Sequence, residues 1–436
     1  MRTSKTSSII GQWGFFLYLT TLSMLGFIAT DMYLPAFKSI ESTLSTTTPL
    51  VAMSLTVFLA GLAAGQLLYG KLVEYWGNKR SLQFGLMIFI VATAMIMLAD
   101  NIVMFNIGRF MQAIGVCSAG VIWQALVIEK YDESQSQSML SSIMPLVALS
   151  PALAPILGAF ILNGWGWQAI FACLVLIGLL LMVATQVLVA GKPTVQLDVN
   201  PSGNQVNVVT NEVKAKTSGK TGFATMLANP FYLGNVLIFA ACSGAFFSYL
   251  TLWPAVMGKF GFDATAIGLS FIPQTLMFIV GGYGSKKLIN KYGANKTLTI
   301  LLGLFFSSTA MIAMITLTGM TTIYPLLVVF AVMASANGAI YPIVVNSALQ
   351  TFKQDAAKAA GLQNFIQISI AFAASSIVAL FAHVYEVAIG LGIVASALLV
   401  MLAYWIRGLN SWQQLKSDFV MPDPARLAIH NNERRK

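Results

Sequence analysis

Two charged side chains lie inside long apolar stretches of this sequence, Asp31 in GFIATDMYLPAF and Arg109 in NIGRFMQAIG. The other fourteen acidic residues fall in polar segments or at the ends of apolar ones. An aspartate in an apolar setting can exchange a proton, because burial favours the neutral acid whereas a nearby arginine favours the carboxylate. The pair therefore indicates proton-coupled chemistry, in which Asp31 carries the proton and Arg109 organises it. The alternative is a static ion pair that ties two helices together.

The elements that must position these side chains are membrane-spanning helices. Of 436 residues, 57% are hydrophobic and 9% are charged, whereas about 25% are charged in a typical soluble domain. Apolar stretches of about 20 residues, the length of helix that crosses a bilayer, recur along the chain. Twelve spans are predicted, over residues 13–36, 48–70, 81–99, 102–128, 138–162, 168–190, 231–256, 265–284, 298–318, 321–349, 358–382 and 386–407. The expected fold class is an all-α membrane protein.

The basic residues predict how these spans are oriented. With both termini in the cytoplasm, 22 of the 25 Lys and Arg residues lie on the cytoplasmic side, Lys38 and Lys259 lie outside, and Arg109 lies within a span. This bias follows the positive-inside rule, and it explains the net charge of +10 without a nucleic-acid partner. Asp31 and Arg109 then lie roughly 8 and 11 Å from the outer ends of their spans. At such similar depths they could face each other.

A polar segment divides the spans into two sets of six. Residues 191–230 are rich in Asn, Thr, Gly and Lys without sustained periodicity, and they are predicted to form a cytoplasmic linker. It separates an N-terminal half (1–190) from a C-terminal half (231–408), which a cytoplasmic tail (409–436) follows. The turns LLYGKLVEYWGNKR and GGYGSKKLINKYGANK occupy corresponding places in the halves. Unless this similarity is coincidental, two related halves favour a secondary transporter whose substrate site lies between them.

The first of these turns contains residues that could control a conformational change. In GKLVEYWGNKR (70–80), Gly70 and Gly77 permit a tight turn, and Arg80 helps to anchor it at the cytoplasmic face. Glu74 could bond a base or a helix end of the neighbouring half and hold one conformation closed. A solvated turn with topological charges is the alternative.

A proline-rich motif is predicted to bend the fifth span. In LSPALAPILGAF (149–160), Pro151 and Pro155 each remove a backbone donor and are expected to bend the helix. Gly158 would allow a neighbouring helix to approach closely. Prolines are ordinary in membrane helices, however, so the motif alone does not establish a moving part.

The string TDMYLPAF, with these motifs in the same order, resembles the Bcr/CflA branch of the major facilitator superfamily. RFMQAIG (109–115) resembles the superfamily's span 4 motif, with Arg109 and Gln112 matching. Glu74 stands where the loop motif usually has Asp. The resemblance implies two pseudo-symmetric six-helix halves in a bacterial inner membrane, alternating access driven by the proton gradient without a cofactor, and drug export in many members.

Longer strings favour a particular cargo within that branch. VCSAGVIWQALV, IMPLVALSPALAP, SFIPQT and ANGAIYPIVV resemble purine-nucleoside transporters of the PunC type. The cargo expected from them is a purine nucleoside such as adenosine or inosine. The alternative is a multidrug/proton antiporter that exports amphiphilic antimicrobials.

A nucleoside needs a stacking surface and amide groups with which to form hydrogen bonds. The candidate substrate-binding residues are Tyr33, Gln274, Asn337, Tyr341 and Asn364. Unpaired amides cost free energy in lipid, so these side chains should face inward, with hydrogen bonding between helices as the alternative role. The spans contain no nucleophile–base set and no metal-ligand set, so we expect neither an enzyme nor a metal site. We expect a monomer that moves a small molecule and protons across the bilayer.

Overall fold

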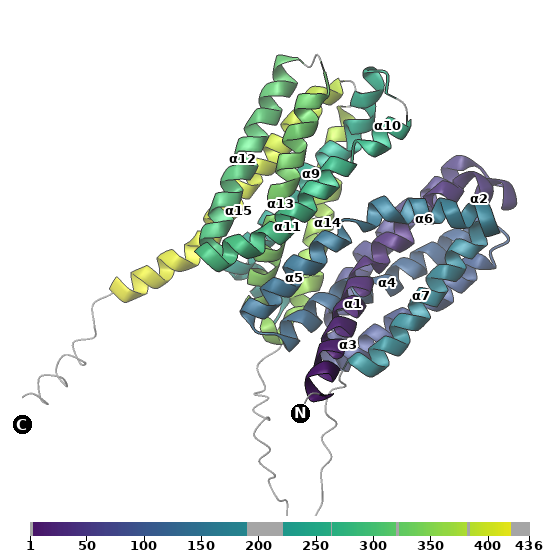
Figure 1. Ribbon diagram of the computed structural model, residues 1–436, viewed down its shortest axis with the longest axis horizontal. Helices are drawn as coiled ribbons and strands as arrows, with labels where there is room; N and C mark the ends of the chain where they lie inside the picture. The colour runs from purple at the N-terminus through teal and green to yellow at the C-terminus, as the bar shows by residue number, and fades with distance from the viewer. Residues whose placement is uncertain (1–2, 190–220, 263, 320–321, 382–383, 420–436) are drawn as a thin grey trace, which may run out of the picture.

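The protein folds into helices that gather in two groups (Figure 1). The computed structural model describes residues 3–189, 221–262, 264–319, 322–381 and 384–419. The first group contains α1 (Thr3–Asp31), η1 (Leu34–Ala36), α2 (Phe37–Thr43), α3 (Thr48–Met97), α4 (Ile102–Lys130), α5 (Glu133–Val147), α6 (Ser150–Trp165) and α7 (Trp167–Leu188). The second contains α8 (Phe223–Ala228), α9 (Pro230–Lys259), α10 (Ala264–Leu269), α11 (Ile272–Tyr292), α12 (Ala294–Thr318), α13 (Tyr324–Thr351), η2 (Lys353–Asp355), α14 (Ala356–Leu380) and α15 (Tyr385–Phe419).

The chain crosses the bundle twelve times, as the hydropathy pattern predicts. Within the described residues, nine helices are long and apolar enough to cross a membrane. One of them, α3, makes two crossings, because the chain reverses at Gly77 with a φ of 75°. The fifth crossing is divided between α5 and α6, and the eighth is α11, whose lysines reduce its hydropathy.

Three predicted boundaries differ from the structure. Helix α1 ends at Asp31 and not at residue 36, because η1 and α2 follow a turn there. Helix α15 continues to Phe419, beyond the predicted end of the C-terminal half at 408, since no proline interrupts the chain before Pro422. The predicted linker lies outside the described residues from 190 to 220, and its last part contains α8.

One of the two predicted proline bends, that at Pro151, also needs correction. The chain leaves the helix between α5 and α6, so Pro151 lies in the first turn of α6 and does not bend a continuous helix. A proline is tolerated there because the first backbone N–H groups of a helix have no intrahelical acceptor. Pro155 does lie inside α6, and Pro145 lies inside α5.

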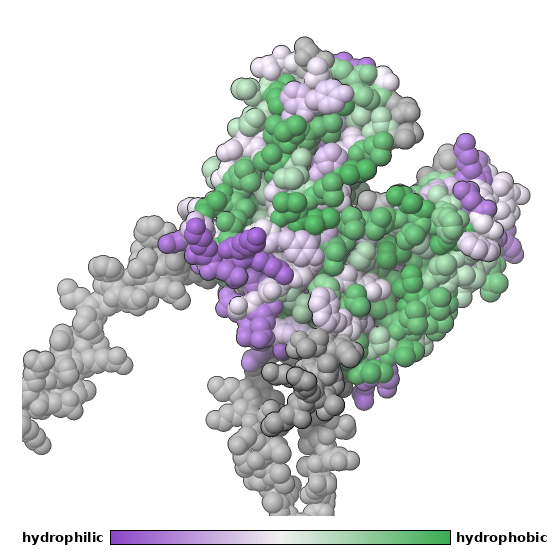
Figure 2. Space-filling view, viewed as in Figure 1, coloured by the Kyte–Doolittle hydropathy of each residue, from purple (hydrophilic) through white to green (hydrophobic). Residues whose placement is uncertain are grey.

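The two halves meet at one end of the molecule and diverge at the other. We call the end where α1 begins and α15 ends the basic end. Figure 1 shows the helices of the two halves together near this end and apart at the opposite end, where Figure 2 shows a notch between them. Figure 2 also shows hydrophobic residues over the flanks and hydrophilic residues gathered toward the ends. This distribution is the one expected of a bundle with lipid-covered sides.

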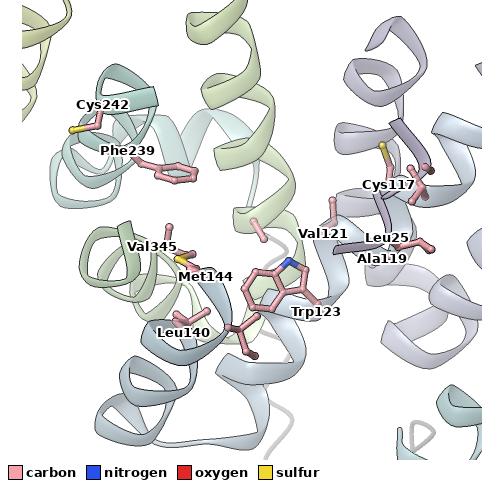
Figure 3. Close-up of a cluster of buried hydrophobic side chains, with 14 of the residues drawn as sticks. Leu25, Cys117, Ala119, Val121, Trp123, Leu140, Met144, Phe239, Cys242 and Val345 are labelled. Carbon is pink, nitrogen blue, oxygen red and sulfur yellow. The ribbon is translucent and has the colours of Figure 1, made fainter. Parts of the chain in front are cut away.

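Buried apolar side chains hold the halves together next to the basic end. Figure 3 shows Trp123 of α4 beside Leu140 and Met144 of α5, with Val345 of α13 close to Met144. Trp123 is 5% exposed, and Leu140 and Val345 are fully buried. The contact between α5 and α13 is therefore part of a continuous core that crosses from one half to the other.

Polar contacts between the halves accompany this core. Glu74 of α3 forms an ion pair with Lys358 of α14, and both side chains are largely buried. Ser136 of α5 donates to the Oδ1 atom of Asn346 in α13 at 2.7 Å. Further hydrogen bonds between the halves also lie on the basic side of the molecule. The structure is thus a conformation closed at the basic end.

A shift of 216 positions relates several residues of one half to residues of the other. Gly77 and Gly293, one shift apart, both begin a new helix with positive φ, 75° and 78°. The same shift takes Gly70 to Lys286 and Ser142 to Lys358. Lys286 donates to Ser142, and Gly70 packs against Lys358, so these two contacts are repeats of each other. This agreement supports the similarity of the two turns seen in the sequence.

We expect Glu74→Gln and Lys358→Met each to open the basic end, because each change leaves a partly buried charge without its partner. The ratio of open to closed conformations should rise about tenfold or more, which corresponds to about 1.4 kcal/mol. Double electron–electron resonance would measure the opening as the distance between spin labels at positions 135 and 291. Gln135 and Lys291 are exposed, and the labels would be attached in a variant without native cysteines.

The matched control is the exchange of Glu74→Lys with Lys358→Glu, which reverses the pair. It should restore the short distance. Unchanged distance distributions in both single variants would contradict the closing role of this ion pair.

Candidate functional site

The centre of the N-terminal half is built around the guanidinium of Arg109. This side chain projects from α4 and is fully buried. Its Nη1 atom donates to the carbonyl oxygen of Ala29 at 3.0 Å and also to the side-chain oxygen of Gln112. The rings of Tyr33 and Phe58 each lie with their centroid 4.2 Å from its Cζ atom. A delocalised cation between two aromatic rings is well accommodated in an apolar interior.

Gln112 extends this arrangement to the next helix. It lies one turn after Arg109 on α4, is fully buried, and donates to the hydroxyl of Thr93 on α3 at 2.8 Å. Its carbonyl oxygen is thereby aimed at the guanidinium. The two residues of the span 4 motif therefore act as one hydrogen-bonded unit that joins α4 to α1 and α3.

Arg109 caps the end of α1. Ala29 belongs to the last turn of that helix, whose carbonyl groups have no intrahelical donors. A cation at this end also balances the partial negative charge of the helix terminus. Arg109 therefore stabilises the end of α1, whose last residue is Asp31, and Pro35 prevents the helix from continuing.

Asp31 and Arg109 do not form the ion pair that the sequence suggested as an alternative. Among the described residues, the two ion pairs are Lys259–Glu386 and Lys358–Glu74. The guanidinium is directed to the backbone of α1 instead, since that carbonyl and Gln112 occupy its inner donor. Asp31 is half-buried, and the charge of Arg109 still acts on it electrostatically. The partial negative charge of the helix C-terminus disfavours the charged form of Asp31, whereas the nearby cation Arg109 favours it. The two influences on the charge of Asp31 therefore oppose each other.

Gly158 brings α6 against the same turn. A side chain at this position would collide with the carbonyl group of Met32, the residue after Asp31. Glycine therefore allows the close approach of α6 and α1 beside the carboxylate. Pro155 lies three residues earlier on α6. The proline-rich motif thus lies next to the candidate proton site.

Tyr33 does not line a cavity, contrary to the expectation from the sequence. Its side chain is fully buried and its hydroxyl forms a 2.8 Å hydrogen bond with Ser54. The ring packs against Phe37, Phe105 and Phe171 as well as the guanidinium. Because α1 ends at Asp31, the turn that follows directs Tyr33 into the core of the half.

In the C-terminal half, two of the predicted substrate residues share one pocket. Gln274 of α11 and Asn337 of α13 line it together with aromatic side chains that include Tyr249 and Phe246 of α9. Gln274 is 4% exposed and Asn337 is 2% exposed. The Nε2 atom of Gln274 donates to the hydroxyl of Tyr249 at 2.5 Å. This pocket is the place where the predicted amide and aromatic groups converge.

The other two predicted substrate residues make contacts between helices instead. The hydroxyl of Tyr341 lies 3.1 Å from that of Ser243 on α9. Asn364 of α14 donates to the carbonyl of Gly120 on α4 at 3.3 Å, which joins the two halves. In this conformation both side chains therefore have the structural role that was the alternative for each of them.

Four residues of the 70–80 turn were predicted to take part in a conformational change or to anchor the turn, and each has different contacts in the structure. Gly70 allows the backbone of α14 to approach, Gly77 supplies the positive φ, and Glu74 bonds Lys358. Arg80 is exposed. Its neighbour Lys79 is the base that fixes the turn, through a 2.8 Å bond to the carbonyl of Gln186 on α7.

Several residues of these sites were not identified from the sequence. Phe58 and Phe330 are single aromatic residues in apolar helices and give no signal by themselves. Lys358 does give one, because a lysine at the first residue of a predicted span is unusual and could have been matched with Glu74. The described residues contain no group of three His, Cys, Asp or Glu side chains placed to bind a metal.

Known proteins resemble this chain in sequence and in fold. The family described as "Major Facilitator Superfamily" matches residues 19–376. The "Bicyclomycin resistance protein homolog" of Haemophilus influenzae is 24% identical over 83% of this chain and 87% of its own length. The "Chloramphenicol resistance protein" of Pseudomonas aeruginosa is 27% identical over 68% of this chain and 67% of its own length.

A solved structure agrees with the arrangement of helices. The transporter FucP in the outward conformation matches with a TM-score of 0.65 at 15% identity, over 89% of this chain and 98% of that chain. A likeness at this identity concerns the fold alone.

We expect Arg109→Lys to lower the thermal stability of the protein in detergent. A lysine keeps the charge but cannot satisfy both acceptors and stack between two rings, so buried oxygens are left unpaired at a cost of about 1–3 kcal/mol. The midpoint of thermal unfolding should fall by several degrees. The same substitution at the exposed Arg80 is the control and should leave the midpoint unchanged; equal midpoints for the two variants would refute the capping role.

Proposed function

The chain belongs to the major facilitator superfamily, within its Bcr/CflA branch, and we propose that it is a proton-coupled exporter of amphiphilic antimicrobial compounds. It is a multi-pass membrane transporter. The relatives named for bicyclomycin and chloramphenicol resistance favour drug export over the purine-nucleoside transport that the longer sequence strings suggested. The proposed location is the inner membrane of a bacterium, with the basic end in the cytoplasm.

The proposal that export is coupled to protons rests on one observation. Asp31 is a half-buried carboxylate at the end of α1 whose turn is fixed by Arg109 and packed by Gly158. It belongs to neither ion pair of the described structure, so no basic side chain holds it permanently charged. A carboxylate of this kind can exchange a proton when its surroundings change.

The proposed cycle uses the closure at the basic end. In the conformation described here the halves are joined near the cytoplasm by the Glu74–Lys358 pair. A drug is released to the outside and Asp31 takes up a proton from there. Neutral Asp31 can be enclosed at lower cost than the carboxylate, so protonation favours closing the outer side. Opening of the basic end then releases the proton and admits the next drug molecule from the cytoplasm.

The test is drug uptake into inside-out membrane vesicles that contain the protein. Radiolabelled chloramphenicol should accumulate when the vesicle interior is made acidic, and a protonophore should abolish the accumulation. Asp31→Asn should reduce proton-driven uptake at least tenfold, because the amide cannot exchange a proton. Asp100→Asn, at an exposed aspartate outside the spans, is the matched control and should leave uptake unchanged.

Adenosine in the same vesicles decides between the two cargoes. The proposal expects no proton-driven adenosine flux. Adenosine flux that depends on Asp31, without chloramphenicol flux, would replace drug export by nucleoside transport. Drug uptake that is unchanged in Asp31→Asn would remove the coupling role from this residue.

A further inference from the structure

The short helix α8 lies beside the ion pair that joins the two halves. It directly precedes α9 and packs against α9 and α14, so it belongs to the C-terminal half. Met226 fixes it there, since this side chain is fully buried. Phe223 is the first residue of α8, and its half-buried ring lies against Lys358, the basic member of the ion pair.

The ring of Phe223 contacts lysines of both halves. The Nζ atom of Lys358 in α14 lies 5.0 Å from the ring centroid. The Nζ atom of Lys71 in α3 lies 5.7 Å from the same centroid. Both atoms are within the distance of about 6 Å at which a cation is attracted to the face of an aromatic ring. Phe223 of the C-terminal half is thus attached to a side chain of the N-terminal half.

The lysines at this contact would otherwise oppose closure of the basic end. Lys358 is neutralised by Glu74, whereas Lys71 belongs to neither of the two ion pairs that the described residues form. Closure therefore brings a second ammonium group toward one that is largely buried. Like charges repel more strongly where water is excluded. An aromatic ring that attracts both cations offsets this repulsion without adding a further charge.

Opening of the basic end would affect the two contacts of the ring differently. Phe223 and Lys358 belong to the same half, so their contact is kept when the halves separate. Lys71 moves away with α3, and so does Glu74. The contact between Phe223 and Lys71 therefore exists in the closed conformation alone, and its free energy favours that conformation.

We propose that Phe223 keeps the basic end closed through these two lysines. Its ring positions the ammonium group of Lys358 on Glu74 and attracts Lys71 of the opposite half. The last part of the predicted linker is then a strap across the closed end, and α8 is the element that carries it. The inference rests on the alternation of conformations in the proposed function and is independent of the cargo.

The reaction rate of a buried cysteine would measure the opening. Ser136→Cys, in a variant without native cysteines, places a thiol at a fully buried position between the halves. N-ethylmaleimide can reach this thiol in the open conformation, so the labelling rate follows the open population even when that population is small. In this background, Phe223→Ala should raise the rate about fivefold, the effect of one cation–π contact. Leu227→Ala, at an exposed residue of α8, is the control and should leave the rate unchanged.

Two further comparisons separate attraction to cations from packing. Phenylalanine with one, two or three ring fluorines at position 223 has nearly the same shape, but the fluorines withdraw electron density from the ring face. The labelling rate should rise with each added fluorine, because the attraction to the lysines weakens. Phe223→Ala should also have a smaller effect in a Lys71→Met background, since the effects of interacting residues are not additive.

Three results would each overturn the assignment. They are a rate that Phe223→Ala leaves unchanged, equal rates throughout the fluorine series, and an effect of Phe223→Ala that is the same with and without Lys71.

These measurements are independent of transport. They use the purified full-length protein in detergent, without drug and without a proton gradient. If the labelling rates follow the expectation but drug uptake is unchanged in Asp31→Asn, the proposed coupling fails and the role of Phe223 stands. If uptake depends on Asp31 but labelling does not depend on Phe223, the role of Phe223 alone fails.

Discussion

The N-terminal half depends on a buried cation, Arg109, whose Nη1 atom donates to α1 and to Gln112 while its Nε and Nη2 atoms have no hydrogen-bond partner. In lipid every polar backbone group needs a partner within the protein, and the last turn of a helix has none of its own. Arg109 supplies a donor to the end of α1, and the rings of Tyr33 and Phe58 enclose its charge. The helix can therefore stop at Asp31, well before the bilayer boundary that hydropathy indicates. This contact and Pro35 together place the candidate proton site at the end of α1.

The two halves share the positions of their turns and of several contacts, but they differ in the charged residues at those positions. Glycines with positive φ reverse the chain at Gly77 and Gly293, and the contacts at the basic end recur with the same shift. The charge is distributed unevenly between the two halves. Glu74 meets Lys358 on one side, whereas Lys286 meets the neutral Ser142 on the other. Among the described residues, the ion pair between the halves thus joins α3 to α14, whereas the contact between α5 and α11 depends on a hydrogen bond from the Lys286 ammonium to an uncharged hydroxyl and on packing.

Hydropathy was sufficient to predict twelve crossings and two halves, because the bilayer imposes one length on every span. It did not predict where α1 ends, which depends on Pro35, a residue that cannot continue the helix, and on a donor eighty residues later in the chain. Asp31 and Arg109 were recognised by their rarity, and the static ion pair that was the alternative to a proton-coupling role is not formed, because the guanidinium donates to a backbone carbonyl. Among the polar candidates, Gln274 and Asn337 converge, whereas Tyr33, Tyr341 and Asn364 serve the scaffold. The sequence alone cannot distinguish an amide that forms hydrogen bonds between helices from an amide that lines a pocket, because both are polar residues within an apolar span.

Asp31 also determines how much net charge crosses the membrane in each turnover of the proposed cycle. In the described part of the chain it is the one carboxylate within a span that lies away from the basic end and the loops, so a single proton enters per turnover. Export of a neutral compound then moves one net charge inward, and the membrane potential adds about 2.3 kcal/mol per 100 mV to the driving force. Export of a monovalent cation is electroneutral and depends on the pH difference alone. Neutral and cationic compounds would therefore be concentrated to different limits by the same protein.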